Sequence, residues 1–154
     1  NASYALDDFF KKRITGLIPG VTYSYSAWIA NSTPLSPINP SVSLKIINPS
    51  DHSVLSELST GDITTSSWKK YELKFIATST SVDLILQNNT IGGIGNNLAI
   101  DDISFAIAPL PIVVSVVHQN SIKKGSIAVT SPLGAIYEYS LDGTTFQSSP
   151  NFTD

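Results

Sequence analysis

Hydrophobic and polar residues alternate one by one over much of this sequence. A period of two is typical of β-strands, because successive side chains of a strand point to opposite faces of its sheet. In the segment "TYSYSAWIAN" the alternation places Trp28 with the serines on one face. The opposite face carries Tyr23, Tyr25, Ala27 and Ile29. No long segment has helical periodicity, so we predict an all-β fold.

The same alternation recurs in "SVSLKIIN", "KYELKFIA" and "SVDLILQNN", each with one apolar face. Segments rich in turn-forming residues separate these runs, among them "NSTPLSPINP", "STGD" and "NNTIGGIGNN". About seven strands at this spacing end near Ala108, and such a series predicts a β-sandwich or a barrel.

A second β pattern follows a short proline-containing connector. Pro109 and Pro111 stiffen the connector, and "IVVSVV", "GSIAVTS" and "AIYEYSLDG" come after it. Roughly 45 residues remain there, which is too few for a self-sufficient sandwich without disulfides or metals. We therefore predict a first domain at residues 1–108, a linker at 109–111, and the opening strands of a partial second β-sandwich at 112–154.

Composition excludes several classes of protein. Apolar residues make up 42% and charged residues 14% of the 154 positions, the opposite of a disordered chain. The net charge of −3 offers no basic surface to nucleic acid. The absence of cysteine removes disulfides, thiolate metal sites and a cysteine nucleophile. The longest apolar run, "FAIAPLPIVVSVV", is shorter than the ~20 residues of a membrane helix, so we predict no membrane span.

Four motifs of the first domain form a recognisable set: "ITGLIPGVTYSYSAWIAN", "SSWKKYELKFIA", "VDLILQNN" and "GNNLAIDDISF". Together they resemble the galactose-binding-like, carbohydrate-binding-module-like domains of large surface proteins of the Bacteroidetes. The resemblance covers residues 14–105 and implies a jelly-roll sandwich. The usual first strand of that jelly roll, upstream of "NASYALDDFF", is expected to be missing, and the absence of Met at position 1 suggests the interior of a longer polypeptide.

Residues 112–154 resemble the opening of the immunoglobulin-like repeat that often follows such a module. "GSIAV" and "YEYSLDGTTFQSSPNF" carry this likeness, although the cysteine common in those repeats is absent from "HQNSIKKGSIAV". Proteins of this kind are typically exported by the type IX secretion system and act as adhesins or gliding-motility filaments. The resemblance thus implies a secreted, cell-surface protein.

Three functions are open at this point. The first is a noncatalytic module for adhesion or glycan binding, with a polysaccharide or surface glycan as its partner. The second is a structural spacer that binds no ligand and contacts only other domains of the same polypeptide. The third is a secreted passenger held by type IX secretion components or by a surface partner.

The closing motif "NLAIDDISF" places two aspartates inside a predicted strand. Adjacent strand residues point to opposite faces, so the pair cannot act as an acid and base on one substrate unless a bulge re-aims one of them. Asp101 shares its predicted face with Ile103, Phe105 and Ile107, so we expect Asp101 to be buried and Asp102 to be solvated. A buried carboxylate needs hydrogen-bond donors or a cation. Either a hydrogen-bonded structural aspartate or a calcium site would answer this need.

The resemblance adds weight to calcium, because the closing aspartate of jelly-roll carbohydrate modules often contributes to a structural calcium site. Asp101 and Asp102 are therefore the candidate calcium ligands. Asp7 and Asp8, in a predicted loop, are secondary candidates for a cation.

Trp28 is the main candidate for binding a glycan. It lies opposite the apolar face of its strand, where an exposed indole offers a flat apolar surface and one N–H donor to a sugar ring. The alternative is that a loop or a neighbouring domain covers it. The polar residues expected on the same sheet surface are Gln87, Lys45, Asp83 and Asn31.

The sequence contains no set of residues typical of an enzyme. No Ser/His/Asp combination or paired acids emerge, and His52 and His118 are isolated and show no metal-binding spacing. Trp68 opens a predicted strand, where we expect it to pack. We predict that the protein is not an enzyme.

Overall fold

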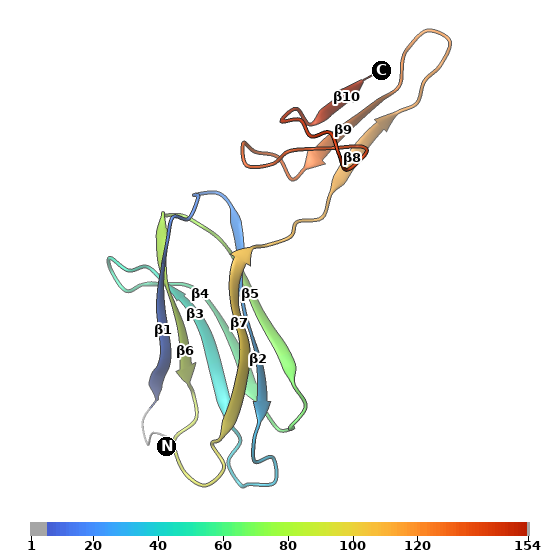
Figure 1. The fold of residues 1–154 in the computed structure, drawn as a ribbon. Helices are drawn as coiled ribbons and strands as arrows, with labels where there is room; N and C mark the ends of the chain where they lie inside the picture. Colours follow the sequence, from blue (N-terminus) through green and yellow to red (C-terminus); the bar gives the residue numbers. More distant parts are fainter. Residues whose placement is uncertain (1–5, 154) are drawn as a thin grey trace. The chain divides into compact units, whose positions relative to one another are not determined.

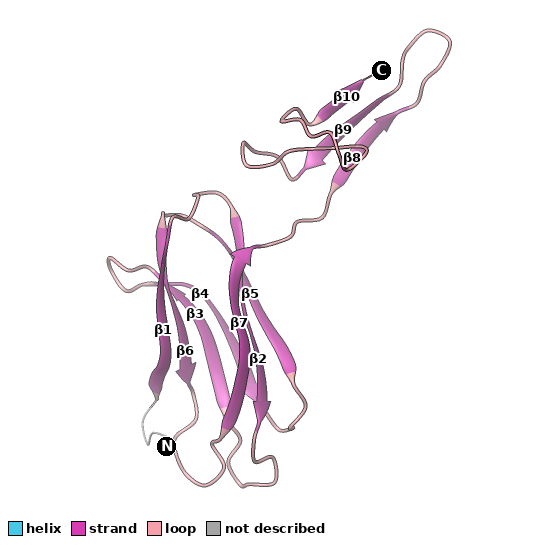
Figure 2. Ribbon diagram, in the orientation of Figure 1, coloured by secondary structure: helices cyan, strands magenta, loops and turns pink. Residues whose placement is uncertain are grey.

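The computed structural model describes residues 6–153 of the chain, which divides into two compact units. The N-terminal unit is Asn1–Ala108 and the C-terminal unit is Pro109–Asp154 (Figure 1). All regular secondary structure in residues 6–153 is β-strand, which confirms the predicted all-β class (Figure 2). A helix of the length and apolarity needed to cross a membrane does not occur in these residues.

The N-terminal unit consists of two antiparallel sheets that pack face to face. The four-stranded sheet has the order β1-β6-β3-β4, with β1 (Asp7–Thr15), β6 (Ser81–Asn88), β3 (Ser41–Ile47) and β4 (Val54–Asp62). The three-stranded sheet has the order β5-β2-β7, with β5 (Lys69–Ile76), β2 (Thr22–Asn31) and β7 (Leu98–Ile107). Apart from β3 and β4, which are adjacent in one sheet, strands that are neighbours in sequence lie in different sheets. This unit is therefore a β-sandwich whose connections cross between the sheets.

The core forms where the inner faces of the two sheets meet. The fully buried side chains include Tyr25 and Ile29 of β2, Leu44 and Ile46 of β3, and Leu86 of β6. These are the apolar faces that the alternation predicted.

An aromatic group closes one region of the core. Tyr23 stacks on Phe105 with ring centroids 5.3 Å apart, and Phe75 lies 6.1 Å from both rings. Tyr25 links the sheets, because its hydroxyl donates to the carbonyl of Ile85 on β6 at 3.3 Å. Burial raises the pKa of Tyr25 above its ordinary value.

A β-bulge interrupts β7 at the two aspartates. Asp101 is paired with Trp28 and Ser104 with Ser26, so Asp102 and Ile103 together stand opposite Ala27. Asp102 has a φ of 48°, in the left-handed region. Phe105 packs against the core. Because the bulge adds one residue between Phe105 and Asp101, Asp101 points to the opposite side, away from the core.

The prediction that Asp101 is buried is therefore wrong. The prediction assigned Asp101 to the face of Phe105 on the assumption of a regular strand, and the bulge shifts that assignment by one residue. Asp101 and Asp102 are both exposed, and Asp101 shares the outer face of its sheet with Trp28.

The C-terminal unit contains a sheet of three short strands. Its order is β10-β9-β8, with β8 (Val113–Val117), β9 (Ser126–Ser131) and β10 (Asn151–Thr153). The predicted strand "AIYEYSLDG" does not form a regular strand, and Tyr139 makes only an isolated bridge to Gln147. The immunoglobulin-like nature of this unit stays a prediction.

Candidate functional site

Trp28 lies in the middle strand of the three-stranded sheet and points outward. Its cross-strand neighbours are Lys70 on β5 and Asp101 on β7, so one row across the sheet reads Lys70, Trp28, Asp101. The side chain of Trp28 is 38% exposed. We call this row, together with Glu72 beside Lys70, the Trp28 face. It combines a flat apolar ring with a cation on one side and an anion on the other.

The two charged neighbours of Trp28 differ in their own partners. Lys70 Nζ lies 3.6 Å from Glu72 Oε1. Glu72 also accepts a 2.7 Å hydrogen bond from the Ser24 hydroxyl, and this bond is the main reason that the pKa of Glu72 is lowered. Asp101 uses one oxygen, Oδ1, to accept the backbone N–H of Asp102 at 2.8 Å. Within residues 6–153 Asp101 forms no salt bridge, so it is the charge on this face that no cation offsets.

Trp68 is a second exposed tryptophan near this face. It immediately precedes β5 and is 48% exposed, so it is not the packing residue that the sequence predicted. The alternation of β5, carried back from Lys70 by two residues, assigns Trp68 to the side of Trp28. The period-two pattern of "WKKYELKF" contained this signal, because Trp68 alternates with the buried Tyr71 and Leu73.

Three of the residues expected beside Trp28 belong to the other sheet. Lys45 lies on β3, and Asp83 and Gln87 lie on β6, all in the four-stranded sheet. The prediction that they share a surface with Trp28 is therefore wrong. Alternation assigns a residue to one side of its own strand, but it does not say which of the two sheets the strand joins.

These three side chains already have partners. Lys45 Nζ lies 3.4 Å from Glu57 Oε1, and Gln87 donates to Asp8 Oδ1 at 3.0 Å. Asp83 is completely buried on the outer side of β6, where side chains of the neighbouring strand β1 contact it.

Asp83 is held by an ion pair with two hydrogen bonds. Arg13 donates from Nε to Oδ1 at 2.7 Å and from Nη2 to Oδ2 at 3.0 Å, and Lys11 Nζ lies 3.6 Å from Oδ2. The hydrogen bond from Arg13 is the largest cause of a lowered pKa of Asp83. This geometry fixes the edge strand β1 to β6 and leaves the carboxylate little capacity for a ligand.

Asn31 belongs to the correct strand but points into the sandwich. It is 1% exposed, on the same side of β2 as Ile29. Its Nδ2 donates to the carbonyl of Ile63 at 2.8 Å, and its Oδ1 accepts the backbone N–H of Thr33 at 2.7 Å. Asn31 thus stabilises the chain at the end of β2 and does not belong to the Trp28 face.

The calcium prediction loses its original argument, since Asp101 is not buried. Residues 6–153 bring together no group of three acidic or histidine side chains that would hold a metal ion. Calcium binding by Asp101 and Asp102 stays a prediction. A calcium titration followed by thermal melting tests it: a rise in Tm that is absent in D101N supports binding, and an unchanged Tm refutes it.

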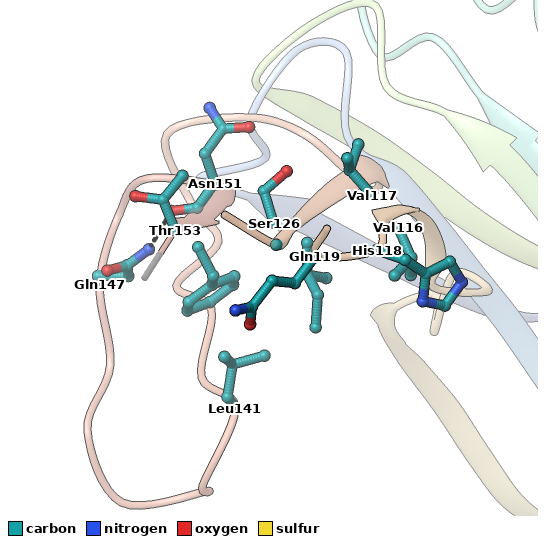
Figure 3. Close-up of a pocket in the computed structure, with 12 residues that line it drawn as sticks. Val116, Val117, His118, Gln119, Ser126, Leu141, Gln147, Asn151 and Thr153 are labelled. Carbon is teal, nitrogen blue, oxygen red and sulfur yellow. Dashed lines mark hydrogen bonds between the residues drawn. The ribbon is translucent and has the colours of Figure 1, made fainter. Parts of the chain in front are cut away.

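The C-terminal unit contains a pocket of about 450 Å³ (Figure 3). Its apolar lining includes Val116, Ile127 and Leu141, and the only titratable residue among its described lining residues is His118. Gln147, also in the lining, donates to the backbone carbonyls of Ser149 and Asn151. The described lining of the pocket contains no Asp, Glu, Lys or Arg, in contrast to the Trp28 face.

Comparison with known proteins identifies the fold. No protein-family model matches this chain, and no curated protein matches it. Among solved structures it is similar to the EclA C-terminal domain, described as a sugar-binding protein, with 25% identity and a TM-score of 0.55 over 69% of this chain and 71% of that chain. It is also similar to a structure titled "CBM4 structure and function", with 17% identity and a TM-score of 0.53 over 70% of this chain and 67% of that chain. The fold is a carbohydrate-binding-module-like jelly-roll β-sandwich, as the sequence predicted.

Proposed function

We propose that the N-terminal unit is a noncatalytic glycan-binding module that binds sugar rings on the Trp28 face. The observation that carries the proposal is an exposed indole at the centre of a sheet, with hydrogen-bonding side chains in register on both sides. The two solved structures of similar fold support it, because one is described as sugar-binding and the other as a carbohydrate-binding module.

The chemistry of the face suits a sugar. The apolar C–H side of a pyranose ring stacks on an indole, and its hydroxyls project from the ring edge toward neighbouring polar groups. Lys70 donates hydrogen bonds and Asp101 accepts them, so a ring over Trp28 meets both kinds of partner. Binding of this type needs no covalent step.

We extend the proposal to the setting of the module. The motif resemblance supports a large, secreted cell-surface adhesin, exported by type IX secretion and associated with gliding motility, in which residues 112–154 open an immunoglobulin-like repeat. In that setting the glycan would be a polysaccharide outside the cell or on a neighbouring surface.

A glycan array probed with the 154-residue chain and its W28A variant tests the proposal. We expect binding to at least one glycan by the wild type and its loss in W28A. The matched control is F9A, because Phe9 is an aromatic residue of similar exposure, 46%, on the other sheet. An array without any binding would refute glycan recognition and favour the structural spacer or the secreted passenger.

A further inference from the structure

The β7 bulge has one clear effect on the surface of the N-terminal unit. In an unbroken ladder counted from Phe105, Asp102 would stand opposite Trp28, and Asp101 would point toward the core opposite Ile29. With the bulge, Ile100 packs against the core and Asp101 stands outside in register with Trp28. The bulge therefore determines which of the two aspartates stands beside the indole, and it turns Ile100 toward the core.

This arrangement includes a strained residue. Asp102 has a φ of 48°. This left-handed conformation is energetically unfavourable for any residue that carries a Cβ. Bulges often re-aim a side chain next to a binding site, and strained backbone is concentrated at such sites. The strain at Asp102 and the exposure of Trp28 are independent observations, and they meet at the same row of the sheet.

The carboxylate of Asp101 is available to a ligand. Its Oδ1 accepts one backbone N–H, which leaves Oδ2 and further lone pairs open. Lys70, on the other side of Trp28, has an acidic neighbour in Glu72. Glu72 lies within the field of both Lys70 and Lys74, whereas Asp101 forms no salt bridge within residues 6–153. The open hydrogen-bonding capacity beside β7 is therefore that of an acceptor.

We propose that Asp101 determines the specificity of the Trp28 face and selects neutral sugars with adjacent free hydroxyls over uronic-acid or sulfated glycans. This inference rests on the proposed stacking of a sugar ring on Trp28. Two neighbouring hydroxyls of the stacked ring donate to the carboxylate, whereas a carboxylate or sulfate on the ligand meets repulsion there and must lose water without a partner.

The experiment measures binding of the 154-residue chain to two sets of polysaccharides by affinity electrophoresis, with calorimetry for those that bind. The neutral set is a glucan, a mannan and a xylan, and the acidic set is polygalacturonate, alginate and chondroitin sulfate. The variants are W28A, D101N and D102N. D101N keeps the oxygen that accepts the Asp102 N–H, and D102N makes the same change of net charge one residue away.

We expect the wild type to bind a neutral glycan and to bind the acidic set at least ten times more weakly. D101N should weaken neutral binding about 10- to 100-fold, the range for losing hydrogen bonds to a charged group, and should narrow the preference over acidic glycans. D102N should bind like the wild type.

Several results would overturn the inference, and they are distinguishable from failure of the proposed function. If W28A loses binding while D101N keeps it, or if D102N behaves like D101N, glycan binding stands and the role of Asp101 falls. Equal or tighter binding of acidic glycans by the wild type has the same meaning. Loss of neutral binding in a chelator would show that Asp101 acts through a cation and not directly on the hydroxyls. No binding by the wild type in either set refutes the glycan-binding function itself.

Discussion

Asp102→Gly is expected to stabilise the N-terminal unit, although glycine usually weakens a strand. The left-handed φ of Asp102 costs a residue with a Cβ roughly 1–2 kcal/mol, and glycine avoids this cost. Glycine loses more backbone entropy on folding, which takes back about 0.5–1 kcal/mol. The net gain is roughly 0–1.5 kcal/mol with a midpoint of about 0.75 kcal/mol, which corresponds to a rise in Tm of a few degrees for a unit of this size.

Urea unfolding followed by tryptophan fluorescence measures this effect selectively, because both tryptophans of the sequence, Trp28 and Trp68, lie in the N-terminal unit. The matched control is Ser104→Gly, on the outer face of the same strand where pairing is regular, and it should destabilise by about 0.5–1 kcal/mol. If both glycine variants destabilise equally, β7 has no left-handed residue at position 102, and the explanation for the outward direction of Asp101 is refuted.

Three further predictions concern the core, the buried ion pair and the binding face. Leu44→Ala removes a fully buried core side chain and should destabilise by about 2–5 kcal/mol in the same urea assay. Val54→Ala changes a side chain that is 51% exposed and should alter stability by less than about 1 kcal/mol. Similar losses in the two variants would contradict the assigned core. The hydrogen bond from Arg13 lowers the pKa of Asp83 from 3.8 in the folded protein. As pH falls below about 4, Asp83 is protonated in the unfolded chain before it is protonated in the folded one, so stability is lost. In D83N this loss should be smaller, and an unchanged acid profile would argue against the ion pair. Trp28→Ala should destabilise less than Leu44→Ala in the urea assay, because the indole lies on the outer face and is 38% exposed. A loss as large as that of Leu44→Ala would mean that lost glycan binding reports unfolding.

The sequence predicted the fold class because alternation is a local property. Each strand shows by itself which of its residues are apolar on one side, and the buried Tyr25, Leu44 and Leu86 follow directly from that pattern. β4 has a weak pattern, with most of its residues exposed at the edge of its sheet, and alternation did not indicate it.

The candidate site was predicted only in its central residue. Trp28 was placed correctly on an outer face, but Lys45, Asp83 and Gln87 were assigned to it without knowledge of which strands pair. Strand pairing depends on contacts between residues far apart in the chain, such as Trp28 with Lys70 and Asp101. The bulge also could not be predicted from "AIDDISF". The alternation of apolar and polar residues does not show where a strand accommodates an extra residue, and one such residue reverses the face to which all preceding residues are assigned.

The edges of the sheets have a consequence for how the protein behaves at high concentration. In the N-terminal unit, the edge strand β1 carries Lys11, Lys12 and Arg13 and a bulge near Phe9, features that hinder pairing with another molecule. The edge strand β8 has neither charge nor proline, and its four valines are each about half exposed. Aggregation of the 154-residue chain should therefore begin at β8 in the C-terminal unit, and a lysine at Val116 should increase its solubility without affecting the Trp28 face.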